Sequence, residues 1–220
     1  MTHVTDWNDH FVLAPPGWRG RLKRAMYGLG HGLSGLAFRT LWRLRVTGRE
    51  NVPLSGPLLI ASNPASFVAP PLVGSSLPRP LYYMGKEELF RWPVFGWIIS
   101  QVNAFPIRRQ EGDVGAVRTA QRILGAGGAL IVFPEGRRQR GGVLGRPKRG
   151  VGLLAVKTRA PVVPAYLDGT HRAWRFPRLR VAFGRPLVAA EGETGDAFTQ
   201  RVMDAIRQLK ETRSGPALNP

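Results

Sequence analysis

Short apolar segments alternate with segments of helical periodicity from residue 45 onward. Each apolar segment is four to six residues long, as buried strands commonly are. The expected strands are Leu58–Ser62, Leu81–Met84, Ala104–Ile107, Ala129–Phe133, Val162–Leu167 and Leu179–Phe183. The expected helices are Phe67–Ser76, Val94–Val102, Val114–Leu124, Val151–Thr158 and Ala197–Thr212. This alternation predicts an α/β fold in which helices flank a mostly parallel central sheet.

The segment Trp18–Leu44 is amphipathic and strongly basic. Its leucines recur near helical spacing, while Arg19 and Lys23 lie near one end and Arg39 and Arg43 near the other. This pattern is typical of a helix or helical hairpin that lies in a membrane interface. A basic helix packed on the rest of the protein is the alternative. The apolar run within the segment is shorter than the roughly 18 to 20 residues that span a bilayer, so we expect no transmembrane helix.

Three regions are expected along the chain. Residues 1–45 form an arm and an amphipathic membrane-interface helix, residues 46–190 form the α/β domain, and residues 191–220 form a C-terminal helix and tail. No secretory signal peptide is expected, because Asp6, Asp9, Pro15 and Pro16 interrupt the first twenty residues.

The composition limits the classes of binding partner to be expected. The 220 residues are 43% hydrophobic and 21% charged, as in globular proteins, and carry a formal charge of +18. Such a charge attracts polyanions, namely nucleic acid, an anionic membrane leaflet or a phosphorylated ligand. The absence of cysteine excludes disulfides and thiolate metal sites and is compatible with the cytosol. We expect no metal ion and no cofactor.

Four segments at expected strand ends carry the candidate chemistry, because ligands of parallel sheets bind beyond the carboxyl ends of the strands. They are Asn63–Ala69, Phe105–Arg109, Phe133–Arg138 and Val162–Tyr166. In order and spacing they resemble the four motifs of the glycerolipid acyltransferases, the lysophosphatidate acyltransferase family. The resemblance covers residues 48–183. It implies that family's α/β fold and a function in phospholipid biosynthesis.

The first segment departs from the family at two positions. The family motif is Asn-His-x-Ser-x-x-Asp; Asn63 and Ser66 match it, but Pro64 stands at the histidine position and Ala69 at the aspartate position. In the family, histidine removes the proton of the acceptor hydroxyl, which attacks the thioester of acyl-CoA or acyl-carrier protein, and aspartate orients the imidazole. Proline and alanine supply neither function. The resemblance therefore implies an impaired enzyme or a pseudoenzyme.

The second and third segments keep basic residues. Arg109 falls where the family has an arginine, and Phe133–Arg138 resembles the family's Phe-Pro-Glu-Gly-Thr-Arg. Arginines suit a lysophosphatidate phosphate because they form paired, charge-assisted hydrogen bonds. The resemblance implies that Arg109 and Arg138, with Lys148, bind this phosphate.

The remaining residues of the third motif are expected to shape the loop. Glu135 anchors it through hydrogen bonds or an ion pair, and Gly136 permits a tight turn that brings backbone amides near a ligand. Arg137 replaces the family's threonine and adds positive charge. That charge is consistent either with tighter anion binding or with crowding of the acceptor.

A substitute base has few candidates. The histidines are His3, His10, His31 and His171. His171 follows the expected strand Val162–Leu167 and lies near the site if that strand is parallel to its neighbours; an ordinary loop histidine is the alternative. Glu87 and Glu88 are weaker candidates, because an exposed carboxylate is a poor base for an alcohol.

The leading hypothesis is a peripheral protein on the cytoplasmic face of an anionic membrane. It binds a lysophospholipid acceptor and either acyl-CoA or acyl-carrier protein, and its acyl transfer is absent or reduced. One alternative is an active acyltransferase with a relocated base such as His171. Another is a basic nucleic-acid-binding protein, suggested by charge alone; the chain has no zinc-finger spacing, aromatic-rich RNA motif or recognition helix, so no specific nucleic acid is expected.

Overall fold

A mostly parallel sheet forms the centre of the protein. The computed structural model describes residues 14–63, 66–108, 113–136 and 144–212. The strands are β1 (Arg45–Thr47), β2 (Leu58–Ser62), β3 (Tyr82–Lys86), β4 (Ala104–Ile107), β5 (Ala129–Val132), β6 (Val162–Asp168) and β7 (Arg180–Phe183). They follow the order β1-β7-β6-β2-β5-β3-β4. All neighbours pair in parallel except β6 and β7, which confirms the predicted α/β fold.

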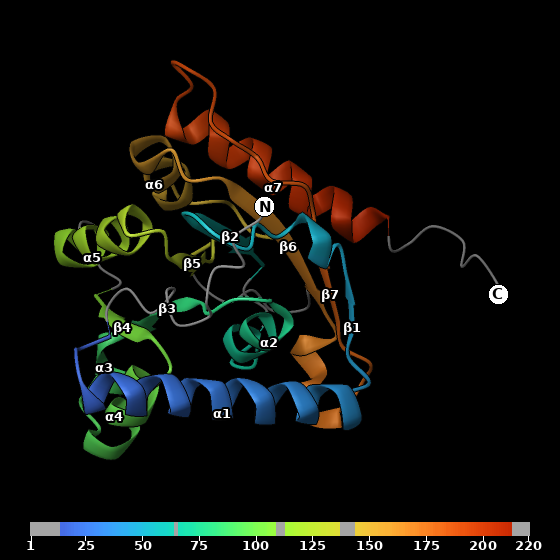
Figure 1. Cartoon of the computed structure of the whole chain (residues 1–220). Helices are drawn as coiled ribbons and strands as arrows, with labels where there is room; N and C mark the ends of the chain where they lie inside the picture. Colours follow the sequence, from blue (N-terminus) through green and yellow to red (C-terminus); the bar gives the residue numbers. More distant parts are fainter. Residues whose placement is uncertain (1–13, 64–65, 109–112, 137–143, 213–220) are drawn as a thin grey trace, which may run out of the picture.

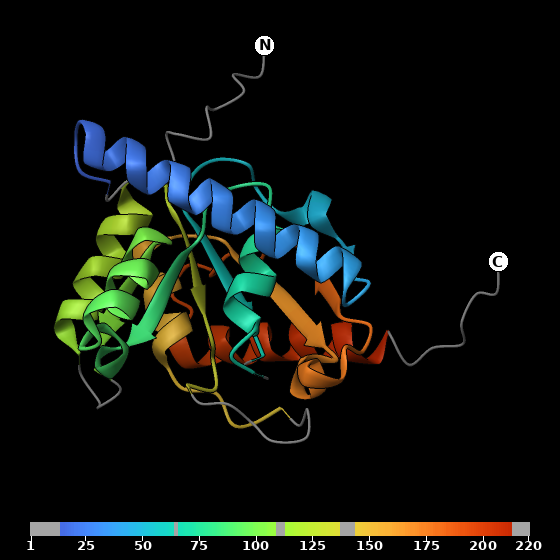
Figure 2. The same cartoon turned by 90° about the horizontal axis from the view of Figure 1, so that it is seen from below.

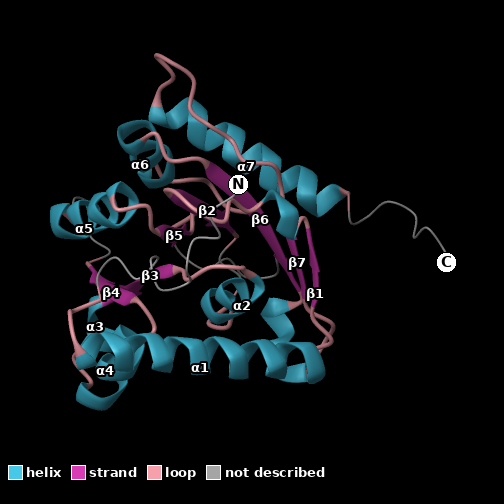
Figure 3. Cartoon of the chain, in the orientation of Figure 1, coloured by secondary structure: helices cyan, strands magenta, loops and turns pink. Residues whose placement is uncertain are grey.

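Helices cover both faces of this sheet. They are α1 (Trp18–Thr40), α2 (Ala69–Ser76), α3 (Glu87–Phe90), α4 (Pro93–Gln101), α5 (Val114–Gly125), α6 (Gly150–Thr158) and α7 (Gly195–Glu211), with 3₁₀ turns η2 (Arg49–Asn51) and η4 (Thr170–Arg175). In Figure 1, α5, α6 and α7 lie on one side of the sheet and α1 and α2 on the other. Figure 3 shows the strands between these two helical layers.

The core lies on both sides of the sheet. Along β2, Leu59 and Ala61 pack into the apolar cluster under α5, α6 and α7. Leu58 and Ile60 pack into the cluster under α1 and α2. All four side chains are fully buried, as expected for a central parallel strand that helices cover on both faces.

The structure shifts some predicted boundaries. The first helix ends at Thr40 instead of Leu44, because Arg43 adopts a left-handed φ of 46° and the Leu44 N–H donates to the Phe38 carbonyl at 2.9 Å. The sequence pattern also missed β1, α3, η2 and η4, which are only three to six residues long. Elements this short carry too little periodicity to be recognised.

Helix α1 packs against the α/β layers and keeps an apolar outer face. Tyr27 and Phe38 are buried, and the Tyr27 hydroxyl accepts a hydrogen bond from the Leu81 N–H at 2.9 Å. On the outer face, Leu29 and Leu33 are 64% and 59% exposed. Residues 18–40 form one continuous helix, not a hairpin. Among the described residues, no helix combines the length and apolar character needed to cross a bilayer.

Candidate active site

The predicted site segments meet at one edge of the sheet. Strands β6, β2, β5, β3 and β4 are parallel neighbours, so their carboxyl ends lie side by side. Seen from below in Figure 2, the arrowheads of β3, β5 and β6 point toward the same edge of the molecule. This edge therefore brings together the turn after β2, the loops after β5 and β4, and the end of β6.

Asn63 fixes the turn after β2 to the end of β6. Its buried side chain donates from Nδ2 to the Leu167 carbonyl at 3.0 Å, and the Leu167 N–H donates to Asn63 Oδ1 at 2.7 Å. The amide thus continues the pairing of the two parallel strands by one residue. Both polar groups of the side chain have partners, as a buried amide requires.

The rest of this turn leads directly into α2. The Ser66 hydroxyl accepts from the Val68 N–H at 3.2 Å, which forms the turn before the helix. Ala69 is the first residue of α2, is 0% exposed and packs in the apolar cluster that contains Leu58 and Ile60. The family's aspartate position is therefore filled by a methyl group in apolar surroundings. Pro64 lies outside the described residues.

Hydrogen bonds and close packing hold the described residues of the loop after β5, which are 133–136 and those from 144 onward. Glu135 is 3% exposed and accepts a hydrogen bond from the Gly145 N–H at 2.8 Å. Gly136 has a φ of 66°, and a Cβ there would lie 2.8 Å from Lys148 Cδ. The Lys148 N–H donates to the Pro134 carbonyl at 2.7 Å. Residues 134–136 thus pack closely against the chain just before α6.

The structure describes only some of the basic residues predicted to bind phosphate in this region. The Lys148 side chain is exposed and its stem lies over Gly136. Arg137 and Arg138 lie outside the described residues. The structure therefore shows the frame of the predicted phosphate-binding loop but not its two arginines.

Two carboxylates bind the described residues at the ends of the loop after β4. The Arg108 N–H donates to Asp113 Oδ2 at 2.6 Å, and Asp113 Oδ1 accepts from the Ala116 N–H at 2.9 Å at the start of α5. These hydrogen bonds, from Ala116 first and then Arg108, lower the pKa of Asp113. The Arg108 side chain pairs with Glu87 at 2.9 Å. Arg109, the predicted phosphate ligand, lies outside the described residues.

Sequence reasoning missed Asp113 and the pairing of Glu87 with Arg108. Asp113 immediately precedes an apolar helical pattern, which is the usual signal of a helix N-cap. The sequence indicates Glu87 only as a weak candidate base. It carries no signal for the pairing of Glu87 with Arg108, because that pairing depends on the proximity of β3 and β4.

The described histidines differ in position. His31 is half-buried in α1, and its Nε2 lies 3.4 Å from the Leu77 carbonyl. Leu77 follows α2, which returns the chain toward the amino end of β3, so His31 is at the opposite edge from the site. Burial lowers the pKa of His31. His171 is exposed in η4, which follows β6 at the carboxyl edge. His3 and His10 lie outside the described residues.

The carboxylates of the two glutamates after β3 are paired with basic side chains. Glu87 accepts from Arg108, and Glu88 pairs with Lys86 at 2.7 Å. The hydrogen bond from Lys86 lowers the pKa of Glu88, which makes this carboxylate a still weaker base.

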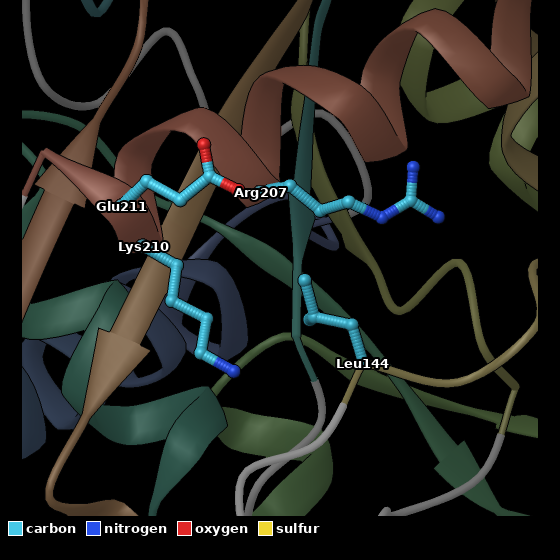
Figure 4. Close-up of a pocket in the computed structure, with 4 residues that line it drawn as sticks. All are labelled: Leu144, Arg207, Lys210 and Glu211. Atoms are coloured by element: carbon cyan, nitrogen blue, oxygen red, sulfur yellow. The ribbon is translucent and has the colours of Figure 1, made fainter.

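A separate hollow lies at the end of α7. Its volume is about 280 Å³, and its lining is formed by Leu144, Arg207, Lys210 and Glu211. Figure 4 shows these side chains between α7 and the chain at Leu144. None of the four belongs to the sequence segments predicted to form the site, and their charges are mixed. The hollow is therefore no substitute for the carboxyl edge of the sheet as the candidate site.

Comparison with known proteins decides the family. The family model described as Acyltransferase matches residues 43–168, which include the turn after β2, the loops after β4 and β5, and β6. The chain belongs to the acyltransferase family. The matched region also contains Asn63, Ser66 and Glu135, which lie at the carboxyl edge of the sheet.

Curated relatives of this acyltransferase-family chain include three 1-acyl-sn-glycerol-3-phosphate acyltransferases. The Bacillus subtilis protein is 28% identical over 76% of this chain and 88% of its own length. The Pseudomonas aeruginosa protein is 29% identical over 77% of this chain and 68% of its own length. The chloroplastic LPAT1 of Arabidopsis thaliana is 32% identical over 59% of this chain. The matched region spans only 37% of that plant protein, and only 38% of a chloroplastic relative from Brassica napus.

A solved structure shares the fold. The 1-acyl-sn-glycerophosphate acyltransferase PlsC of Thermotoga maritima matches with a TM-score of 0.75 over 94% of this chain and 87% of its own. At 24% sequence identity, this similarity supports the fold and not the chemistry.

Proposed function

We propose that this chain is a membrane-associated lysophosphatidate-binding protein of the acyltransferase family in which conventional acyl transfer is absent or strongly reduced. The acceptor is a lysophosphatidate-like lysophospholipid, and the donor is acyl-CoA or acyl-carrier protein. The names of the bacterial relatives support the acceptor class, and the family supports the reaction class. The protein acts peripherally, on the cytoplasmic face of the membrane.

The observation that carries the proposal is the environment of Ala69. A family aspartate at this position orients the catalytic histidine, but here a methyl group is fully buried in the apolar cluster that also contains Leu58 and Ile60. Pro64, at the histidine position, has no titratable group. Loss of general-base catalysis typically lowers a rate by about 10² to 10⁴. Proximity and anion binding alone leave only residual turnover.

A second candidate function rests on His171. This histidine is exposed at the carboxyl edge, after the strand β6 that pairs with β2. In this alternative, His171 removes the proton from the acceptor hydroxyl in place of the missing histidine. The chain is then an active acyltransferase with a relocated base.

One assay separates the two candidates. Purified full-length protein is incubated with lysophosphatidate and either acyl-CoA or acyl-carrier protein, and lysophosphatidate binding is measured in parallel by calorimetry. Binding with at most residual turnover supports our proposal. Robust turnover that His171→Ala abolishes contradicts it and establishes the relocated base.

The membrane part of the proposal rests on α1. Its outer face exposes Leu29, Leu33 and Leu36, and the helix has several basic residues and no acidic residue. Deletion of α1 is an unsuitable test because Tyr27 and Phe38 are part of the packing. The sharper test replaces the three exposed leucines by serine and measures co-sedimentation with vesicles of phosphatidylglycerol and phosphatidylcholine. We expect the triple variant to remain folded and to lose vesicle binding; unchanged binding would contradict a role for this face.

A further inference from the structure

Helix α4 exposes its large apolar side chains, the reverse of the usual pattern for a helix on the surface of a water-soluble protein. Its only buried residue within Pro93–Gln101 is Gly96, which packs against Phe90; a Cβ there would lie 2.7 Å from the Phe90 carbonyl oxygen. The large apolar side chains point outward instead: Trp92, just before the helix, is 73% exposed and Val94 is 72% exposed. Phe95, Trp97 and Ile98 are also exposed. A soluble helix normally buries such residues and exposes polar ones.

This apolar surface adjoins the outer face of α1. Gly30 of α1 approaches Val102 at the end of α4, with only 3.6 Å from an added Cβ to Val102 Cγ1. Figure 1 shows the two helices together at the lower edge of the molecule, on the side of the sheet that α2 covers. The exposed leucines of α1 and the exposed aromatic residues of α4 therefore belong to one side of the protein. Large exposed apolar side chains that gather on two neighbouring helices mark an interaction site.

The charges around this surface identify the partner. Neither α1 nor the stretch Arg91–Asn103 contains an acidic residue, whereas Arg91 and five basic residues of α1 are present. A second copy of the chain would bring these like charges together. An anionic lipid surface offers the opposite charge together with an apolar layer. Trp92 and Trp97 suit the boundary between headgroups and acyl chains.

The length of α4 sets its orientation. Nine residues extend about 14 Å, roughly half of the hydrocarbon thickness of about 30 Å, so α4 cannot span a bilayer. A short helix with an apolar outer side lies in the plane of the interface instead.

We infer that α4 is a second membrane-contacting element, which enters an anionic lipid interface beside α1. The inference rests on the proposed membrane location and adds a separate surface to it. With two elements in contact, the protein has a fixed orientation on the membrane, because one helix alone permits rotation about its own axis.

The absence of cysteine allows a direct test of this contact. Single cysteines replace Val94 on α4, Leu33 on α1 and, as a control, Val188. The Val188 side chain is 55% exposed, follows β7 and belongs to neither helix. Each is labelled with an environment-sensitive fluorophore in the full chain and titrated with phosphatidylglycerol-containing vesicles without substrate. We expect emission to rise and shift to the blue at positions 94 and 33, and to stay unchanged at position 188.

The other outcomes are equally decisive. A response at position 33 without one at position 94 overturns the inference but leaves the proposed membrane location intact. No response at either position overturns both. A response at position 94 that depends on protein concentration and not on vesicles indicates a second copy of the chain and also overturns the inference. None of these outcomes depends on acyl transfer, so they are independent of the catalytic proposal.

Partition measurements provide a second readout. The double variant Trp92→Ser/Val94→Ser is expected to bind anionic vesicles at least about tenfold more weakly. Arg91→Gln is expected to weaken binding about fivefold, the equivalent of about 1 kcal/mol. The matched control Leu54→Ser/Val188→Ser removes two exposed apolar side chains elsewhere and leaves binding unchanged. Equal loss in the control would contradict a specific role for α4.

Discussion

The turns after β2 and β5 are neighbours at the same sheet edge, yet they differ in what fills them. Ala61 of β2 pairs with Val132 of β5, so the two turns begin side by side. After β5, buried Glu135 has a hydrogen-bond partner and left-handed Gly136 packs against Lys148. After β2, Ala69 places a methyl group in an apolar cluster.

The difference separates residues that support the fold from residues that serve only the reaction. Asn63 bonds Leu167 across two strands, and Glu135 bonds Gly145, so each has a structural task independent of chemistry. A histidine at position 64 and an aspartate at position 69 have their main task in proton transfer. The four expectations that follow test this division, beginning with the largest effect.

Restoring only the aspartate is expected to damage the fold most. Ala69→Asp places a carboxylate in the apolar cluster without a histidine partner, which lowers the free energy of unfolding by about 3 kcal/mol or more. Urea denaturation measures this change. Ala69→Ser is the control, and we expect it to cost less because the hydroxyl is neutral. An undiminished stability of Ala69→Asp would mean that the site still provides partners for the carboxylate.

Asn63→Ala is expected to lower the free energy of unfolding by about 2 to 3 kcal/mol, because it leaves the buried Leu167 N–H and carbonyl without this partner. The control is Asn51→Ala, which removes a single half-buried bond to the Phe183 carbonyl. A smaller loss for Asn63→Ala than for Asn51→Ala would argue against the structural role of Asn63. Thermal unfolding followed by circular dichroism measures both.

Gly136→Ala is expected to cost about 1 to 3 kcal/mol, because alanine at a φ of 66° is strained and its Cβ would crowd Lys148. It should also weaken lysophosphatidate binding. The control, Gly192→Ala, has the same left-handed strain at a φ of 74° with nothing within 4 Å of the added Cβ. Calorimetric titration of lysophosphatidate distinguishes the two variants. Equal affinity for lysophosphatidate in both would argue against a role of the loop after β5 in acceptor binding.

The smallest effect is expected at the start of α5. Asp113→Ala removes an N-cap, at a cost of about 1 kcal/mol, and also frees the Arg108 backbone next to Arg109. Thr194→Ala removes the corresponding cap of α7, where the side chain accepts from the Ala197 N–H. Both variants should lose similar stability, but only Asp113→Ala should lose acceptor affinity. An equal loss of affinity would point to a general effect of destabilisation.

The sequence predicts most of the elements but few of their relations in space. The apolar segments identify six strands because each is a short apolar run bounded by polar or turn-forming residues. The three-residue β1 is too short for such a signal. The strand order is set by packing, so no local pattern shows that β2 lies between β6 and β5.

The same limit applies to the site. Motif spacing predicts the turn and loops, but the bond between Asn63 and Leu167 joins residues 104 positions apart. The pairing of Arg108 with Glu87 likewise needs β3 and β4 to be neighbours. For α4, periodicity predicts the helix but does not show that Gly96 faces inward and the aromatic residues face outward.

The most direct test of the account restores the missing pair. Turnover of lysophosphatidate with acyl-CoA and with acyl-carrier protein is measured for the wild-type chain and for Pro64→His/Ala69→Asp. Since we propose that the acceptor is bound and only proton transfer is missing, the double variant should gain about 10² to 10⁴ in rate at similar acceptor affinity. Wild-type turnover that already matches the folded double variant, and that disappears in His171→Ala, would contradict the account.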